Sequence, residues 1–309
     1  MLWFKYYAML ALRKLIIIIL FPLTLSCQQM DITFYSWDDF ASNFGKEMVS
    51  ADDVYATMKK SGLKDFTYSK FDYHFVSNDK KKLEALNNFI LDHYDYEFVG
   101  FTKFNSLHEL RGFTNEIPIT NDNLLYWVLD MAKRGMEFDC KLDGYGSAPD
   151  NENPTLPNFS KEKEDYYFNK AIELYNQGDL SGSIFNWTIV LQINPNDPNS
   201  YYSRAIVKDE LFTWKSAIRD YDKAIELAPD FSDAIVNRAT VKDENGDYSG
   251  AIEDYNRAIA LDANNSMAFF NRGNTNFNMG NKTQACEDWN KAHELGDETA
   301  AQRIATNCK

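Results

Sequence analysis

The residue types that most often perform catalysis are scattered along this sequence of 309 residues. No serine stands in a nucleophile-elbow context, and no glycine-rich phosphate loop occurs. Asp139 and Asp143, on either side of an expected strand, are a weak candidate for metal binding. The four histidines show none of the paired spacings typical of a metal site; they are His74, His93, His108 and His293. We therefore expect no catalytic residue, no metal site and no cofactor.

Four cysteines at scattered spacings match neither a zinc site nor a disulfide-rich scaffold. Cys140 alternates with apolar neighbours, which favours a buried free thiol. Cys286 lies near the start of the last repeat helix, and Cys308 lies at the end of the helix that follows. Two antiparallel helices, each rising about 1.5 Å per residue, would bring these thiols close together. We predict a Cys286–Cys308 disulfide in an oxidising compartment; the alternative is two unrelated core cysteines.

The first 27 residues have the layout of an export signal. Arg13 and Lys14 precede an apolar run of about ten residues, which is typical of a secretory signal peptide. The run is shorter than the roughly 20 apolar residues that span a bilayer. Ser26 followed by Cys27 resembles the lipobox of bacterial lipoproteins, in which the chain is cut before the cysteine and its sulfur receives a diacylglycerol.

That resemblance implies an exported protein, anchored by a lipid on Cys27 in the bacterial cell envelope, in the periplasm or at the outer membrane. The alternatives are a simple N-terminal membrane anchor or an ordinary signal cut nearby. The start of the chain is Met1 or Met9. Residues 28–48, after the signal, form an unassigned tether.

The charge balance disfavours nucleic-acid binding. The net charge is −14, and both later parts of the chain are acidic. Residues 28–160 contain 13 basic and 22 acidic residues, and residues 161–309 contain 16 and 24. Because both parts would repel a phosphate backbone, we expect no nucleic-acid partner.

A repeat of 34 residues fills the C-terminal half, after a polar linker at 149–160. A small residue recurs in each repeat, with a large aromatic residue four positions later. The small residues are Ser183, Ala217, Ala251 and Ala285, and the aromatic residues are Trp187, Tyr221, Tyr255 and Trp289. This period and these residue types resemble the tetratricopeptide repeat. The resemblance implies an all-α solenoid in a domain at 161–309, with repeats at 164–197, 198–231, 232–265 and 266–299 and a capping helix at 297–307.

Two features of the repeats predict local structure. Glycine stands at the turn between the helices in repeats one, three and four, whereas repeat two has Phe212, so its turn should differ. Repeats two to four carry an arginine in the first helix and an aspartate in the second, whereas repeat one has Lys170 and Asn186. We predict ion pairs worth about 0.5 kcal/mol if partly exposed; the alternative is a family pattern copied by duplication. The pairs are Arg204–Asp220, Arg238–Asp254 and Arg272–Asp288.

In tetratricopeptide repeats, the first helix of each repeat lines a concave groove. The candidate groove residues here are Phe168, Ile172, Tyr202, Asp209, Glu210, Asp243, Glu244, Phe270 and Asn274. The family's carboxylate clamp needs lysine or arginine with asparagine, and only Asn274 matches. We therefore expect a protein or peptide partner with apolar anchors and one or two basic side chains. The alternative is that the aromatic residues only pack between repeats.

Residues 49–148 are predicted to form a separate domain. Ser50 is expected to cap a helix that ends at Ser61-Gly62, and two further helices are expected after Asp79 and Thr120. The expected strands lie at 71–76, 96–104, 110–119 and 136–142. The order β-α-β-β-α-β is that of a ferredoxin-like α/β sandwich, which makes the chain α+β overall.

This order, the aromatic first strand and the closing Asp143-Gly144-Tyr145-Gly146 resemble the regulator of ribonuclease activity B family over about 49–146. That family inhibits ribonuclease E, a cytoplasmic enzyme that an exported domain would not meet. The resemblance therefore implies the fold rather than the inhibition.

The sequence predicts a non-enzymatic scaffold or adaptor of the bacterial envelope. It would bind a protein or peptide in the repeat groove and be held at the membrane by its N-terminal lipid. The first alternative is a regulator in which the α/β domain inhibits a ribonuclease and the repeats are a platform. The second is an enzyme accessory whose α/β domain binds a small ligand.

Overall fold

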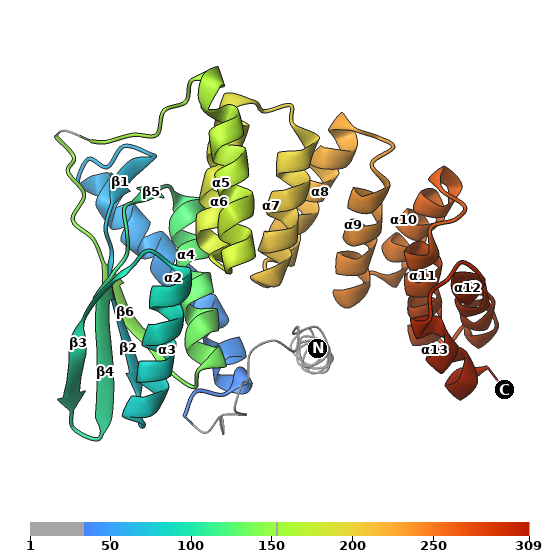
Figure 1. Ribbon diagram of the computed structural model, residues 1–309, viewed down its shortest axis with the longest axis horizontal. Helices are drawn as coiled ribbons and strands as arrows, with labels where there is room; N and C mark the ends of the chain where they lie inside the picture. The colour runs from blue at the N-terminus through green and yellow to red at the C-terminus, as the bar shows by residue number, and fades with distance from the viewer. Residues whose placement is uncertain (1–33, 153, 309) are drawn as a thin grey trace. The chain divides into compact units, whose positions relative to one another are not determined.

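The computed structural model describes residues 34–152 and 154–308 (Figure 1). Cys27 and the rest of the expected export signal therefore lie outside the described residues. The chain is mostly helical, with a small sheet region followed by helical hairpins. It divides into two compact units, one that extends to Pro195 and one that begins at Asn196.

The sheet region of the first unit contains four antiparallel strands in the order β3-β4-β2-β6, so β3 and β6 are its edges. These strands are β2 (Asp72–Ser77), β3 (Glu97–Phe104), β4 (Leu107–Phe113) and β6 (Lys141–Gly146). A separate antiparallel pair consists of β1 (Thr67–Ser69) and β5 (Ile117–Ile119). The helices of this region are α2 (Trp37–Lys60), α3 (Lys80–His93) and α4 (Asn121–Glu137).

The two faces of the sheet differ in burial. Tyr73 and Phe75 of β2 are fully buried on the face that helices cover. His74, between them, points to the opposite face, where its ring nitrogens lie 2.9 Å from Glu109 Oε1 and 3.1 Å from Asp72 Oδ2. This alternation agrees with the period of two that predicted the strand.

The first helix begins well before its predicted start. Ser36, rather than Ser50, is its N-cap: Ser36 Oγ accepts a hydrogen bond from the Asp39 N–H at 3.2 Å, and the Asp39 carboxylate accepts one from the Ser36 N–H at 3.0 Å. Trp37 and Phe40 are buried on this helix. The aromatic residues of the expected tether therefore belong to the folded domain.

Two predicted strand boundaries were also wrong. The expected strand at 110–119 is divided between the end of β4 and the short β5. Helix α4 continues to Glu137, so the strand expected at 136–142 begins only at Lys141. Asp139, with a φ of 54°, reverses the chain between the helix and β6. Cys140 is a buried free thiol, as predicted.

The first compact unit does not end at the predicted linker, 149–160, because it includes a helical hairpin. This hairpin consists of α5 (Glu164–Gln177) and α6 (Leu180–Ile193). Gly178 ends α5 in the left-handed conformation, with a φ of 86°. The turn of the hairpin lies against α4.

A buried polar network fixes this turn to α4. Asp130 Oδ2 accepts a hydrogen bond from the Ser181 N–H at 3.0 Å, and Arg134 Nη2 donates one to the Gly178 carbonyl at 2.8 Å. The Tyr94 hydroxyl lies 3.1 Å from both oxygens of Asp130 and accepts from Arg134 Nε at 3.0 Å. The three side chains involved, those of Asp130, Arg134 and Tyr94, are all less than a tenth exposed. Because removing one partner of a buried pair costs about 3–5 kcal/mol, this network holds the hairpin firmly.

Asp179 adds a second carboxylate to the network. It caps α6 by accepting a hydrogen bond from the Gly182 N–H at 2.7 Å. Burial and the negative charge of Asp130 raise the pKa of Asp179 to about 7, against the opposing effects of its hydrogen bonds and Arg134.

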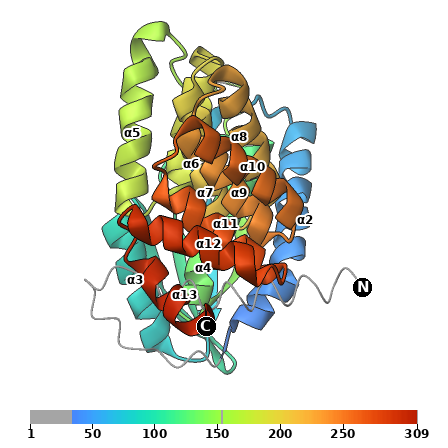
Figure 2. The same ribbon diagram turned by 90° about the vertical axis from the view of Figure 1, so that its right-hand side faces the viewer.

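The second unit consists of three successive helical hairpins and a final helix (Figure 2). Each hairpin packs against the next one along the chain. The helices are α7 (Pro198–Glu210), α8 (Trp214–Leu227), α9 (Ser232–Glu244), α10 (Tyr248–Leu261), α11 (Ser266–Asn278), α12 (Lys282–Glu294) and α13 (Thr299–Asn307). Their bounds follow predicted repeats two to four, and α13 corresponds to the predicted capping helix.

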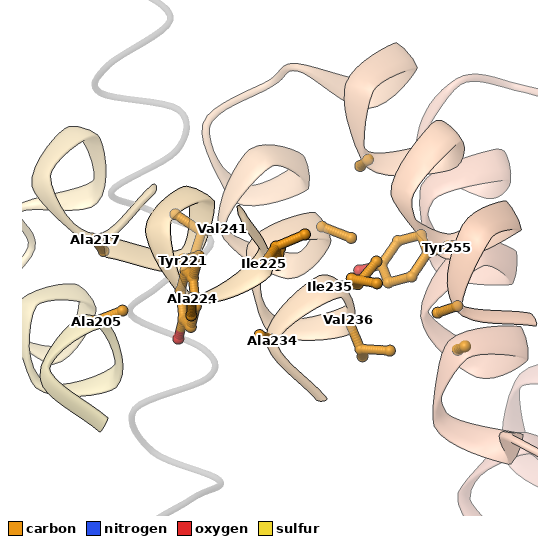
Figure 3. Close-up of a cluster of buried hydrophobic side chains, with 14 residues drawn as sticks. Ala205, Ala217, Tyr221, Ala224, Ile225, Ala234, Ile235, Val236, Val241 and Tyr255 are labelled. Carbon is orange, nitrogen blue, oxygen red and sulfur yellow. The ribbon is translucent and has the colours of Figure 1, made fainter. Parts of the chain in front are cut away.

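Small residues let the paired helices approach closely, and aromatic rings fill the space beside them (Figure 3). Ala205 and Ala217 are fully buried next to Tyr221. In the last repeat, a Cβ on Gly273 would lie 2.7 Å from Trp289 Cδ1, so only glycine fits there. This arrangement agrees with the small and large positions found in the sequence.

The turn between the helices of repeat two was predicted to differ, but it has the same left-handed backbone conformation as the glycine turns. Phe212 adopts a left-handed φ of 60°, close to the 81° of Gly246 and the 85° of Gly280. The carbonyl of Lys208 accepts hydrogen bonds from both the N–H and the hydroxyl of Thr213, at 2.9 and 2.7 Å. These contacts hold the end of α7 and offset the strain of a bulky residue in this conformation.

A disulfide between Cys286 and Cys308 joins α12 to the end of α13, with the two Cα atoms 5.7 Å apart. The bond closes a loop with a sequence separation of 22 residues. A loop of this length is worth about 3 kcal/mol in unfolding free energy. The terminal helix is thereby tied to the last repeat.

The raised pKa of Asp179 predicts how stability changes with pH. Because the folded-state pKa lies above the ordinary 3.8, the unfolding free energy should fall as pH rises from about 4 to about 7, by up to about 1.4 kcal/mol per pH unit. The variant Asp179→Asn keeps an oxygen to cap α6 but cannot ionise. In urea unfolding, the unfolding free energy of the variant minus that of the parent chain should be larger at pH 8 than at pH 5. Equal differences at the two pH values would contradict this assignment.

Candidate functional site

Each hairpin of the second unit is held together by a two-point ion pair between its helices. The arginine donates through Nε and Nη2 to the two oxygens of one aspartate, at distances from 2.6 to 3.0 Å. The pairs are Arg204–Asp220, Arg238–Asp254 and Arg272–Asp288. In the first hairpin, Lys170 instead contacts Glu173, and Asn186 donates to a backbone carbonyl of its own helix. The predicted pairing is therefore present in all three repeats that carry both residues.

These ion pairs are more buried than predicted. The aspartate side chains are only 6–8% exposed. Each also receives a second donor from the first helix: Lys208, Lys242 or Asn276, at 2.7 to 3.1 Å. For Asp220, the charges and hydrogen bonds of Arg204 and Lys208 outweigh burial and lower its pKa. The estimate of about 0.5 kcal/mol was made for a partly exposed pair and does not apply to these buried ones, in which removing one partner costs about 3–5 kcal/mol.

Two of the arginines also link neighbouring repeats. Arg238 Nη1 donates to Asp222 of α8 at 2.6 Å, and Arg272 Nη1 donates to Asn256 of α10 at 2.6 Å. Each arginine thus fixes the rotation of its own helix against both the second helix of its repeat and the repeat before. The opposite surface of the first helices is thereby held in a defined orientation.

Tyr202 is the central aromatic residue of the predicted groove in the second unit. It is half-buried, its ring lies 4.8 Å from that of Phe231 and 6.1 Å from that of Tyr221, and its hydroxyl accepts a hydrogen bond from Asn237 at 3.2 Å. The ring therefore packs between repeats two and three while leaving part of its surface exposed.

The predicted acidic residues lie at the C-terminal ends of α7 and α9. Asp243 is half-buried; burial is the main cause that raises its pKa, the charge of Glu244 adds to it, and Thr275 and Asn278 oppose it. Within the described part of the chain, Asp243 Oδ1 has no hydrogen-bond partner. The side chains of Asp209, Glu210 and Glu244 are partly or largely exposed. These ends therefore concentrate negative charge.

Phe270 and Asn274 of α11 are both engaged within their own repeat. Phe270 packs against the cluster of Ala285, Trp289 and Ala292. Asn274 Oδ1 accepts a hydrogen bond from Trp289 Nε1 at 3.1 Å. Asn274 therefore supports the core as well as lining the predicted groove.

Phe168 and Ile172 lie in the first compact unit, on α5. Phe168 packs against Tyr167, Ile189 and Val190, whereas Ile172 is 39% exposed. The nine predicted groove residues are thus divided between the two units, and seven of them belong to the second.

A family model for the TPR, or tetratricopeptide, repeat matches residues 244–280. This segment contains the last residue of α9, the whole of α10 and α11, and the turn after α11. The period of 34 residues carries the same pattern to the adjoining hairpins. The tetratricopeptide repeat is thus shown for residues 244–280, and the adjoining hairpins resemble it. No curated protein matches the sequence.

Solved structures with tetratricopeptide-like folds resemble the chain only at low sequence identity. MamA from Desulfovibrio magneticus RS-1 is 19% identical over 44% of this chain and 76% of its own, with a TM-score of 0.42. PilF of Pseudomonas aeruginosa is 22% identical over 44% and 62%, with a TM-score of 0.41. The first repeat domain of Spaghetti (RPAP3), bound to an HSP90 peptide, is 21% identical over 38% and 94%, with a TM-score of 0.38. At these scores the likenesses add nothing to the assignment.

A row of hydrogen-bonded polar side chains between the tetratricopeptide repeats was not predicted from the sequence. Asn237 donates to the Tyr202 hydroxyl, and Asn271 Nδ2 lies 3.4 Å from Thr240 Oγ1, which is also 3.1 Å from the Tyr255 hydroxyl. The signal was available, because the two asparagines are 34 residues apart, directly before the paired arginines.

The remaining candidates do not form a catalytic arrangement. Among residues 34–152 and 154–308, no group of three histidine, cysteine or acidic side chains is placed to hold a metal ion. Asp139 is fully buried, whereas the Asp143 side chain is 53% exposed. No helix in the same ranges is long and apolar enough to cross a bilayer.

Proposed function

We propose that this chain is a non-enzymatic scaffold or adaptor whose tetratricopeptide repeats bind a peptide with apolar anchors and at least one basic side chain. The observation that carries this proposal is the combination, on the first helices of the second unit, of half-buried Tyr202 with the acidic ends of α7 and α9. Repeats of this kind present extended concave surfaces to protein partners. A surface of negative potential attracts positively charged ligands and disfavours acidic ones.

Asp243 and Glu244 place negative charge at the end of α9, which would attract the basic side chain of the peptide. Because Oδ1 of Asp243 is buried, this attraction would act through space rather than through a hydrogen bond to that atom. Tyr202 would contact the apolar anchor with the exposed part of its ring.

We also propose that the chain acts in the bacterial envelope, anchored through Cys27. The Cys286–Cys308 disulfide supports an oxidising compartment. The strand order β3-β4-β2-β6 supports a ferredoxin-like arrangement for the α/β part. The resemblance to the ribonuclease regulators, and an inhibitory role with the repeats as a platform, stay predictions from the sequence.

The groove proposal is tested by charge variants that keep side-chain shape. The fluorescein-labelled peptide Leu-Lys-Tyr-Lys-Leu should bind the chain more tightly than Leu-Glu-Tyr-Glu-Leu. The variant Asp243→Asn, alone or with Glu244→Gln, should weaken the first peptide about tenfold in fluorescence anisotropy, a loss of about 1.4 kcal/mol. Glu226→Gln on α8, which neutralises an exposed acid paired with Lys223, is the matched control. Unchanged binding in the groove variants, or preference for the acidic peptide, would refute the proposal.

The envelope proposal is tested on protein recovered from bacterial membranes. Non-reducing peptide mapping by mass spectrometry should find an N-terminal Cys27 that carries a diacylglycerol, together with a Cys286–Cys308 bridged peptide. The lipid on Cys27 tests the membrane anchoring, and the bridged peptide tests whether the protein lies in an oxidising compartment. An unprocessed N-terminus would contradict the anchor, and free thiols at both positions would contradict the disulfide.

A further inference from the structure

The edge strand β6 of the sheet lies between two surface hollows, and neither is formed by the helical repeats. It pairs with β2, with a register shift at Asp143 that leaves Gly144–Gly146 in regular pairing, and within the described residues it pairs with no other strand. An edge strand presents a row of backbone N–H and C=O groups on its open side. Such an edge is a template for an added strand.

The first hollow lies between α2 and the end of β6. It has a volume of about 680 Å³ and is lined by Val49, Val54 and Met58 of α2 and by Tyr145 and Gly146 of β6, among others. Val49 is 60% exposed. The Tyr145 ring stands edge-on to the Trp127 ring of α4 at 5.5 Å, and its hydroxyl donates to Ser50 Oγ at 2.9 Å. This hollow is on the helix-covered side of the sheet and has an apolar floor.

The second hollow lies on the opposite side of the same residues. It has a volume of about 270 Å³ and is lined by Asp72, His74 and Asp143 with Gly144, Tyr145 and Gly146. It exists because β6 has no side chain at Gly144 and Gly146, which pair with His74 and Asp72. A Cβ on Gly144 would meet no atom within 4 Å.

The charges around the second hollow favour a cation. Asp72 and Asp143 line it directly, with side chains 39% and 53% exposed. His74 lies between Asp72 and Glu109, and Lys141 is 3.8 Å from Asp143 in an exposed contact that contributes little. Two carboxylates beside a hollow that neither Gly144 nor Gly146 fills would pair well with an incoming guanidinium or ammonium group.

We propose that β6 binds an extended peptide as an added strand, with an apolar side chain in the α2 hollow and an adjacent basic side chain in the Asp72–Asp143 hollow. Successive side chains of a strand point to opposite faces, so neighbouring residues of one peptide would reach the two hollows. Backbone hydrogen bonds to β6 would supply affinity, and the two hollows would supply specificity. This site is separate from the groove of the tetratricopeptide repeats.

The test uses the full chain and the fluorescein-labelled peptide Thr-Leu-Arg-Leu-Arg-Thr, in which apolar and basic residues alternate. Gly144→Val fills the second hollow without a clash and should weaken binding at least tenfold in fluorescence anisotropy. Gly45→Leu narrows the first hollow and should act in the same direction, since a Cβ there also meets nothing within 4 Å. Gly100→Val on the opposite edge strand, β3, is the matched control, because its Cβ meets nothing within 4 Å either. Circular dichroism verifies that each variant is folded.

Four results would overturn the inference. The first is equal binding of Thr-Leu-Leu-Arg-Arg-Thr, which has the same composition without the alternation. The second is equal loss in Gly100→Val and Gly144→Val. The third is a loss that follows Asp243→Asn instead, which would place the peptide in the repeat groove and leave the proposed function intact. If Gly144→Val alters self-association of the chain rather than peptide binding, β6 pairs with a second copy and the inference is wrong.

Discussion

The fold depends on the pairing of its buried carboxylates with cationic and hydrogen-bonding side chains. In the last three hairpins, Asp220, Asp254 and Asp288 each bind an arginine through both oxygens and take a second donor from the same first helix. Because a buried charge costs several kcal/mol unless it is paired, the two helices cannot rotate against each other without breaking these contacts. The surface that the first helices present to a partner is therefore set by ion pairs on their other side.

The first hairpin, α5–α6, is held in place by different contacts. It has Lys170 and Asn186 where the other repeats have the ion pair, and it is held by the network on α4. There carboxylates outnumber the cation, since Asp130, Asp179 and Glu137 all lie near the single guanidinium of Arg134. This hairpin repeats the sequence pattern of the solenoid but belongs to the compact unit of the α/β domain. The second unit is then a module of three repeats with a capping helix.

The sequence predicted most of what recurs or is local and missed what is long-range. The period of 34, the arginine–aspartate pairs and the position of Cys286 relative to Cys308 follow from spacing alone. The docking of the first hairpin does not, because Tyr94 and Gly178 are brought together only by the tertiary fold. The start of α2 at Ser36 was missed although its capping box is local. For the groove, residue types predicted which side chains form the surface. They could not decide whether Tyr202 packs between repeats or binds a ligand, because its ring contacts the next repeat and is also partly exposed to solvent.

The central claim is that the hairpin α5–α6 folds with the α/β domain and leaves three repeats as the binding module. Native-state hydrogen exchange of the full chain in low urea measures this directly, because it reports which helices open as one unit. We predict that the amides of α6 open with the same free energy and urea dependence as those of α4, and that those of α8 and α10 open separately. If the amides of α6 instead open together with those of α8, the division of the molecule described here is contradicted.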